Sequence, residues 1–177
     1  ILKFYKMNQE QILLKVPLVE CKNSGIHGMG VYAKEDIPKG IKLIEYIGEV
    51  ISKEEGNRRA DEQEKKSKKN PEYGRVYIFD LNKKYDLDGN FSWNLARFIN
   101  HSCKPNCKYK QEGNRVWIAS KRNIKKGEEI TYDYDYDLED YKEHICKCGS
   151  DNCIGFIIGK SYWKKFRELN AENKQVN

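Results

Sequence analysis

The sequence predicts a mostly β domain with α insertions. Several short stretches are rich in β-branched and apolar residues and are separated by glycine-containing turns, which is typical of short strands. Only two segments, residues 52–70 and 161–177, have helical composition or spacing. The 177 residues are enough for one domain with a core of its own. No apolar run is long enough to cross a bilayer, so we expect a soluble protein with no membrane partner.

Residues 1–20 are interpreted as a flank with one short strand, because apolar and charged residues mix around Pro17. The chain opens at Ile1 without a charged leader, an apolar stretch or a small-residue cleavage site, so we expect a trimmed N-terminus and not a signal peptide. From residue 21 to residue 40, closely spaced glycines predict short extended pieces, such as 31–33, joined by turns.

A strand and a charged helix are expected next. Residues 41–51 are apolar and β-branched, and Gly48 inside them predicts a bulge or a close backbone contact. Ser52 and Glu55 have the spacing of a capping box, and the charged residues that follow predict a helix over 52–70, ended by an Asn-Pro pair. This helix has almost no apolar face, so we expect an exposed insertion and not a core element.

The second half of the chain returns to strand-like sequence and ends in a helix. Three further strands, with glycine turns between them, are predicted at 76–81, 116–119 and 129–134. Ser161 favours an N-cap, and the apolar residues behind it recur at helical spacing as Tyr162, Trp163, Phe166 and Leu169. No internal repeat is evident in the sequence.

The charge is mildly basic and unevenly distributed. Lysine and arginine number 33 against 27 aspartate and glutamate residues, which gives a formal net charge of +6. The basic run at 65–69 is interpreted as a solvated face, whereas the acidic run at 133–140 suggests a basic peptide partner such as a histone tail. A zinc module that binds nucleic acid is an alternative, but the cysteines lie beside acidic residues, and direct nucleic-acid binding is not required.

Three of the six cysteines crowd into one short segment, as Cys146, Cys148 and Cys153. Six cysteines are too few for a disulfide scaffold in a chain of this size, and their density predicts a metal site in a reducing compartment. Structural Zn²⁺ takes four thiolate or imidazole ligands, so a fourth ligand must come from elsewhere. The candidates for it are Cys103, Cys107, His144 and Cys21. Free or paired thiols are the alternative.

Two further segments contain polar side chains that could form a binding or catalytic site. Asn100 and His101 follow an apolar pair and place an amide and an imidazole where they can bind a heteroaromatic edge, although a lone histidine is more often structural. Tyr132, Tyr134 and Tyr136 alternate in a predicted strand and should share one face. That face is either an aromatic ladder packed on the core or a hydroxyl-bearing channel.

Together with the turn Gly28-Met29-Gly30, these motifs resemble, in order, the SET-domain lysine methyltransferases that carry a post-SET zinc segment. The matching segments, over roughly residues 20 to 160, begin at Gly28, Glu45, Arg97, Glu129 and Cys146. The resemblance implies a SET-domain fold of small curved β-sheets around a pseudoknot-like core. Within it, 21–143 forms the SET domain, 144–160 the post-SET zinc segment and 161–177 a C-terminal helix and tail. Met29 stands where the family often has a basic residue.

The resemblance also implies roles for individual residues. The zinc ligands that it implies are Cys103, Cys146, Cys148 and Cys153. The cofactor that it implies is S-adenosylmethionine, contacted by His27, Gly28, Met29, Gly30, Tyr77, Asn100 and His101. Tyr134 corresponds to the principal active-site tyrosine and Tyr46 to a second wall of the lysine channel. Tyr132 corresponds to the position that tunes how many methyl groups are added.

The implied function is methyl transfer from S-adenosylmethionine to the side-chain amine of a protein lysine, with a histone as the expected substrate. A catalytically silent SET-like module that binds peptide or chromatin is the alternative. Regulatory subunits are compatible with either interpretation. The expected location is the nucleus for a eukaryotic source, and the cytoplasm or an infected host cell for a bacterial one.

Overall fold

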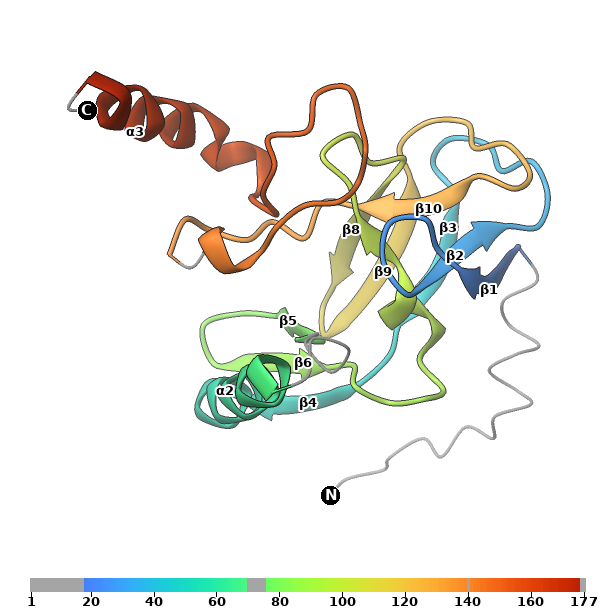
Figure 1. Ribbon diagram of the computed structural model, residues 1–177. Helices are drawn as coiled ribbons and strands as arrows, with labels where there is room; N and C mark the ends of the chain where they lie inside the picture. Colours follow the sequence, from blue (N-terminus) through green and yellow to red (C-terminus); the bar gives the residue numbers. More distant parts are fainter. Residues whose placement is uncertain (1–17, 70–75, 140, 176–177) are drawn as a thin grey trace.

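The computed structural model describes residues 18–69, 76–139 and 141–175 (Figure 1). Its strands are β1 (Val19–Asn23), β2 (Met29–Ala33), β3 (Lys42–Tyr46), β4 (Glu49–Ser52), β5 (Ile78–Asp80), β6 (Tyr85–Asp88), β7 (Asn100–His101), β8 (Cys107–Glu112), β9 (Arg115–Ser120) and β10 (Glu129–Tyr132). Its helices are α2 (Lys53–Lys69), α3 (Trp163–Gln175) and short 3₁₀ helices at Leu95–Phe98, Tyr141–Glu143 and Lys160–Tyr162. The prediction of a mostly β fold with helical insertions is confirmed. Among the described residues, no helix is long and apolar enough to cross a membrane.

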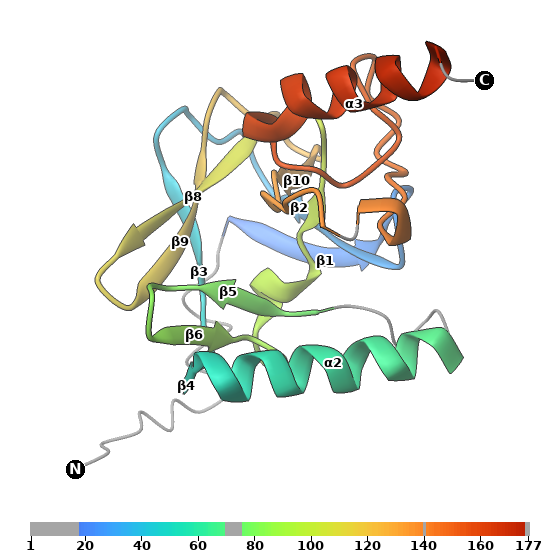
Figure 2. The same cartoon turned by 90° about the vertical axis from the view of Figure 1, so that its left-hand side faces the viewer.

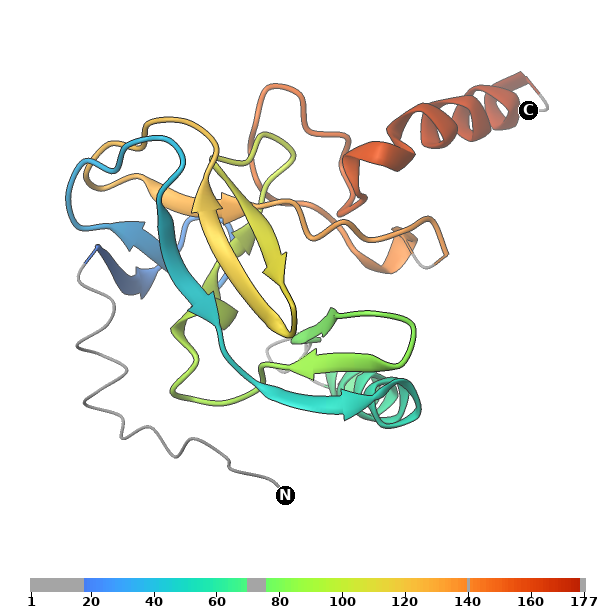
Figure 3. The same ribbon diagram turned by 180° about the vertical axis from the view of Figure 1, so that it is seen from behind.

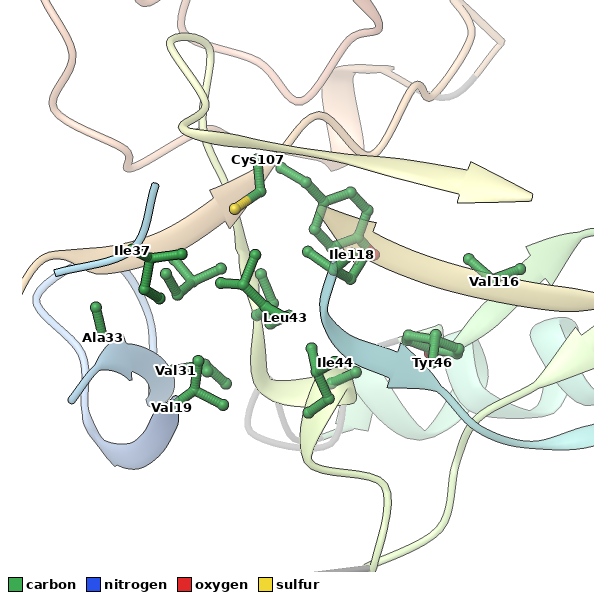
Figure 4. Packing of buried hydrophobic residues seen from close by; sticks show 14 of the residues in the cluster. Val19, Val31, Ala33, Ile37, Leu43, Ile44, Tyr46, Cys107, Val116 and Ile118 are labelled. Carbon is green, nitrogen blue, oxygen red and sulfur yellow. The ribbon is translucent and has the colours of Figure 1, made fainter. Parts of the chain in front are cut away.

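The strands form three small sheets, with the orders β1-β2-β10-β7, β3-β9-β8 and β4-β6-β5. A single apolar cluster lies between them, and Figure 4 shows side chains from several strands converging on it, among them Val31, Leu43, Val116 and Ile118. Branched side chains at alternate positions of β9 point inward, so that Val116 and Ile118 are fully buried. The sheets are therefore held together by shared apolar burial.

The segment 41–51 forms two strands, and the prediction of one strand with a bulge is wrong. β3 pairs with β9 and β4 pairs with β6, so the two halves belong to different sheets. The chain changes sheet at Gly48, where a Cβ atom would lie 2.1 Å from the carbonyl oxygen of Asp88. The close backbone contact expected at Gly48 is confirmed, because only glycine fits at that crossing.

Helix α2 begins where the capping residues predict. The backbone N–H of Glu55 donates to Ser52 Oγ at 3.2 Å, which is the N-cap bond. The helix lies along the β4-β6-β5 sheet with most of its surface exposed, as expected of an insertion (Figure 2). Its attachment was not predicted: Gly56 packs against the buried carboxylate of Asp86, which also accepts a hydrogen bond from Lys53 at 2.6 Å. The predicted Asn-Pro stop and most of the flank 1–20 lie outside the described residues.

Several predicted boundaries shift. β5 lies within the predicted strand 76–81, and β9 extends one residue beyond the predicted strand 116–119 at each end. β10 ends at Tyr132 and not at residue 134. β6 and β8 were not predicted. β8 is mostly polar and exposed and shows no apolar alternation. The terminal helix α3 starts at Trp163 after a 3₁₀ turn and projects away from the sheets (Figures 1 and 3).

Two turns pair with each other in a local two-fold arrangement that sequence inspection missed. Residues 34–40 and 121–127 share the pattern K-x-x-I-x-K-G. Ile37 and Ile124 exchange both backbone hydrogen bonds, at 2.8 and 2.9 Å. The outer bonds are also equivalent: one runs from the N–H of Gly40 to the carbonyl of Ser120, and the other from the N–H of Gly127 to the carbonyl of Ala33. The statement that no internal repeat is present was therefore wrong at this local level.

Candidate active site and metal centre

The two-residue strand β7 carries Asn100 and His101 into the middle of the molecule. It pairs in parallel with β10, so that Asn100 lies opposite Thr131 and His101 opposite Tyr132. Both side chains are buried, at 3% and 4% exposure. The pairing joins the amide and the imidazole to the strand that leads into the tyrosine segment. The structure thus brings together two motifs that are about thirty residues apart in sequence.

Asn100 ties the predicted cofactor loop to the sheet. Its side-chain Nδ2 lies 2.7 Å from Glu129 Oε1 and 3.2 Å from the carbonyl oxygen of Met29. A Cβ atom at Gly30 would lie 2.4 Å from Glu129 Oε1 and 2.9 Å from Ser24 Cβ, so a larger residue there would displace these side chains. His27 lies in the exposed part of the same loop. Glu129 was not predicted as a site residue, although it opens one of the motif segments that resemble the family.

His101 is a neutral imidazole with a defined orientation. Burial lowers its pKa to about 4, against a smaller opposing effect of Asp133. The backbone N–H of Tyr134 donates to its Nδ1 at 3.2 Å, and the rings of His101 and Tyr134 lie edge to face at 5.4 Å. The imidazole therefore accepts through Nδ1 and is packed directly against the predicted principal tyrosine.

The tyrosines gather although only the first lies in a strand. The ring centroids of Tyr132 and Tyr134 are 5.0 Å apart, and those of Tyr134 and Tyr136 are 5.7 Å apart. The predicted common face exists, but alternation in one strand is not its cause, because β10 stops at Tyr132. Asp135, between two of these tyrosines, has a positive φ of 60° and redirects the chain.

Phe79 connects this cluster to Tyr46. Its ring stacks on Tyr132 at 5.9 Å and meets Tyr46 edge-on at 4.8 Å. The hydroxyl of Tyr46 donates to the carbonyl oxygen of Tyr77 at 2.9 Å, which links the second predicted wall of the channel to a predicted cofactor residue. Phe79 was not predicted for the site. Its aromatic character in a predicted strand was the available signal, but it did not distinguish a channel from ordinary core.

The hydroxyls in this aromatic cluster remain protonated at neutral pH. Burial raises the pKa of Tyr136 to about 12, and burial also raises the pKa values of Tyr46 and Tyr132 well above their ordinary value. The hydroxyl of Tyr134 donates to the carbonyl oxygen of Ile99 at 2.9 Å. The cluster is an apolar, hydroxyl-bearing environment in which a cationic amine loses water.

Four cysteine sulfurs converge at the other side of His101. The Sγ atoms of Cys103, Cys146, Cys148 and Cys153 all lie within 4.8 Å of one another. Cys103 Sγ is 3.8 Å from the sulfurs of both Cys146 and Cys153, and none of the six cysteines, all of which are described, forms a disulfide. A Zn–S length near 2.3 Å gives a tetrahedron with edges of about 3.8 Å, so this arrangement fits zinc.

The other three candidates for the fourth ligand lie elsewhere. Cys107 is fully buried in the apolar core, where burial raises the pKa of its thiol to about 12. Cys21 lies on β1, and the ring of His144 packs edge-on against Tyr136 at 5.0 Å. The position of the four-cysteine group therefore matches the ligand set that the resemblance implied.

A polar hollow of about 350 Å³ lies between helix α2 and the residues leading into β5. Arg58, Arg59 and Lys66 line it from α2, and Tyr77 and Asp88 line it from the sheet. Neither the 27–30 loop nor the Asn-His strand contributes to its lining. The hollow therefore adjoins the predicted cofactor residues only at Tyr77.

Comparison with known proteins places this geometry in a family. The family model described as SET domain matches residues 28–135. The chain is 40% identical over 158 residues to histone-lysine N-methyltransferase set-2 of Caenorhabditis elegans, covering 87% of this chain and 10% of that protein. It is 42% identical over 135 residues to histone-lysine N-methyltransferase trr of Drosophila melanogaster, covering 73% of this chain and 5% of that protein. It is 40% identical over 135 residues to histone-lysine N-methyltransferase 2D of Homo sapiens, covering 73% of this chain and 2% of that protein. The chain thus spans a tenth or less of the length of these relatives.

Proposed function

Because the chain belongs to the SET-domain family, we propose that it transfers a methyl group from S-adenosylmethionine to the side-chain amine of a protein lysine. One observation carries the proposal: the buried Asn100–His101 strand is packed directly against Tyr134 at the head of an aromatic cluster. A methyl donor held by the Asn100–His101 strand can then face an amine enclosed by the aromatic cluster.

The amine must be neutral to attack. A free lysine has a pKa near 10.4, so only about one in a few thousand is neutral at pH 7. The rings of Tyr46, Tyr132 and Phe79 surround the entering side chain with apolar surface, which disfavours the ammonium and lowers its pKa. The proton is released to solvent before attack, because the protonated tyrosines of this cluster are poor bases.

When bound, S-adenosylmethionine would supply a methyl group on a sulfonium, whose carbon–sulfur bond would break as the nitrogen–carbon bond forms. Tyr134 is fixed by its hydroxyl bond to Ile99 and by its backbone bond to His101, so its ring forms a rigid wall of the slot. We assign Tyr46 and Tyr132 to the remaining walls. The protein contributes position and water exclusion, which are the main requirements of an in-line displacement.

We assign cofactor binding to Asn100 and His101, to the loop His27, Gly28, Met29 and Gly30, and to Tyr77. The side-chain amide of Asn100 ties this loop to β7 through the carbonyls of His27 and Met29. Their chemistry fits the adenosine portion: neutral imidazole, backbone amides and carbonyls, and an aromatic ring. Zn²⁺ is assigned to Cys103, Cys146, Cys148 and Cys153, whose sulfur separations support a structural ion. This ion would join the tail to the segment directly after His101.

A histone tail is the proposed substrate, and the nucleus is the proposed location. Support comes from the names of the relatives and from the acidic side chains that follow the site, including Asp133, Asp135, Asp137 and Glu139. Carboxylates beside the slot favour a peptide rich in lysine and arginine.

Transfer of a radiolabelled methyl group to mixed histones tests the function. We expect labelling by the wild type, and a loss of turnover of about 100-fold in Tyr134→Phe with little change in cofactor affinity. Tyr85→Phe is the matched control, because Tyr85 is 46% exposed and lies outside the aromatic cluster. Equal turnover of Tyr134→Phe and wild type would contradict the assignment.

A catalytically silent module that only binds peptide is the second candidate. The same assay separates it from an enzyme, since a silent module binds histone peptides but transfers no label. The close packing of His101, Tyr134 and Tyr132 favours the enzyme, because peptide binding alone gives no reason to bury these polar groups beside one another.

A further inference from the structure

The outer face of the β3-β9-β8 sheet carries a group of basic side chains. Val116 and Ile118 of β9 are buried in the apolar cluster between the sheets, so the residues that alternate with them point away from it. Figure 3 shows the three strands at the front of the molecule, with no described helix over them. Six charged residues define this basic face, and four of them are cations: Lys42, Glu45, Lys108, Lys110, Glu112 and Arg115.

The register of the strands places these cations close to one another. Lys42 and Lys108 lie opposite Ala119, one on each side of it, and Lys110 lies opposite Trp117. Lys108 and Lys110 occupy alternate positions of β8, which are about 7 Å apart, and Lys42 lies two strands away from Lys108, about 10 Å across the sheet. Like charges at these distances repel one another, so the arrangement costs free energy unless an anionic partner neutralises it.

Two of the four cations are already neutralised within the face. The side-chain nitrogen of Lys42 lies 5.1 Å from the ring centroid of Trp117, and the guanidinium carbon of Arg115 lies 4.8 Å from it. Both cations also form ion pairs, Lys42 with Glu112 at 2.6 Å and Arg115 with Glu45 at 2.7 Å. The indole is therefore covered by two cations that are fixed by their own carboxylates.

Lys108 and Lys110 supply the charge that is left over. Neither takes part in an ion pair between described residues. Lys108 is exposed and Lys110 is half-buried, and both project from β8, which is the edge strand of its sheet. On the other side of the same strand, Tyr109 meets Phe79 edge-on at 5.4 Å. The free cations thus lie one strand away from the aromatic cluster of the proposed active site.

A double-stranded nucleic acid fits this face better than an acidic protein does. Protein–protein interfaces have an apolar centre, whereas the aromatic ring in the middle of this face lies under two cations. The same cover argues against a single strand, whose unpaired bases stack on open aromatic rings. Interfaces with DNA are polar and positively charged, and most of their hydrogen bonds go to phosphates and sugars.

We infer that the basic face binds the phosphate backbone of duplex DNA, with Lys108 and Lys110 as the main contacts. Histones carry DNA wrapped around them, so the choice of DNA as the duplex rests on the proposed function. A lysine that contacts phosphate adds affinity without reading sequence, and each such contact makes binding more sensitive to salt. Binding should therefore be independent of DNA sequence and strongly weakened by salt.

Fluorescence anisotropy of a labelled DNA duplex, titrated with the full chain at several salt concentrations, tests the inference. No cofactor and no histone are added, so the result does not depend on methyl transfer. We expect the wild type to bind with a Kd in the micromolar range at low salt. Lys108→Ala/Lys110→Ala should weaken binding about 10-fold or more and lower the slope of log K against log salt by about 2. Lys108→Arg/Lys110→Arg should keep the affinity and the slope.

Lys164→Ala/Lys165→Ala is the matched control, because it removes the same charge from exposed positions of α3, outside the basic face. It should bind the duplex as the wild type does. Equal losses in the two alanine variants overturn the inference, since net charge alone would then explain binding. A wild type that binds poly-glutamate or single-stranded DNA more tightly than the duplex overturns it as well. Absence of duplex binding by the wild type overturns it without any variant, and the radiolabelled-methyl assay still decides the proposed function separately.

Discussion

The apolar core between the three sheets and the cluster around the cysteines are built in different ways. The first, the sheet core, contains seventeen buried residues drawn from both halves of the chain. The second, the tail cluster, has only four buried residues, Cys103, Ile158, Trp163 and Phe166, with the other cysteines and several aromatic rings half-buried around them. Apolar burial can hold the sheet core, but four buried residues cannot order a tail of some thirty residues.

The difference teaches what a metal ion would do here. Zn²⁺ bound by the four sulfurs would supply folding free energy that the sparse apolar burial around them does not. The two regions meet at the tyrosine segment: the Gly159 N–H donates to the carbonyl of Tyr136 at 2.8 Å, and the Lys160 N–H donates to Asp133 at 3.0 Å. A tail folded by metal would then complete one side of the proposed active site.

Removal of the metal should have the largest effect, and only on the tail. We expect Cys146→Ser, or a strong chelator, to abolish hydrogen-exchange protection over residues 144–169, because zinc binding contributes on the order of 10 kcal/mol to the folding of such segments. Protection in β3 and β9 should remain. Cys21→Ser is the control, since Cys21 lies on β1 outside the ligand set. Equal loss of protection in the sheets would show that the two regions are not separate.

Truncation of one core side chain in each region sharpens the comparison. Ile118 is fully buried in the sheet core, so Ile118→Ala should lower the free energy of unfolding by about 2–5 kcal/mol. Phe166 is 9% exposed in the tail cluster, and Phe166→Ala should increase local exchange there without shifting the main denaturation midpoint. Urea denaturation followed by circular dichroism measures the midpoints of both variants, and amide hydrogen exchange measures the local opening in the tail. An equal shift of the midpoint in both variants would contradict the division.

The junction between the regions should respond to one added methyl group. A Cβ atom at Gly159 would lie 2.2 Å from Asp135 Oδ1 and 2.9 Å from Asp135 Cα, so Gly159→Ala must displace the tail from the tyrosine segment. We expect turnover to fall about 10- to 100-fold through misplacement of the channel wall. Zinc content and the denaturation midpoint should not change. Unaltered turnover would mean that the tail does not complete the site.

A substitution inside the sheet core, Tyr132→Phe, should have the smallest effect on the rate but should change the product. Tyr132 is 8% exposed and stacks on Phe79, so Tyr132→Phe keeps the ring packing and removes only the hydroxyl. The space and the lost hydrogen bond beside the amine should allow further transfers, giving more di- and trimethyllysine. Mass spectrometry of the peptide product measures this. An unchanged distribution of mono-, di- and trimethyllysine would show that Tyr132 does not control how many methyl groups are added.

Local sequence was enough for those parts of the fold that depend on neighbouring residues. The cap at Ser52, the close contact at Gly48 and the β-branched strand β9 follow from residue types within a few positions. Strand β8 could not be predicted in this way, since its charged side chains are exposed and its pairing with β9 carries the signal. The grouping of the tyrosines was predicted for an incorrect reason, because Asp135 redirects the chain beyond β10.

The sequence by itself determined the class of fold, the family and the chemistry of the ligands, because residue types and motif order need no coordinates. Cysteine spacing left four candidates for the fourth ligand and the resemblance pointed to Cys103, whose sulfur the tertiary structure places with the other three. Only the tertiary structure decided that Phe79 joins the aromatic cluster. It alone showed that the buried Nε atom of Arg97 has no hydrogen-bond partner among the described residues. Each of these depends on distances between segments far apart in sequence, which arise when burial brings the sheets together.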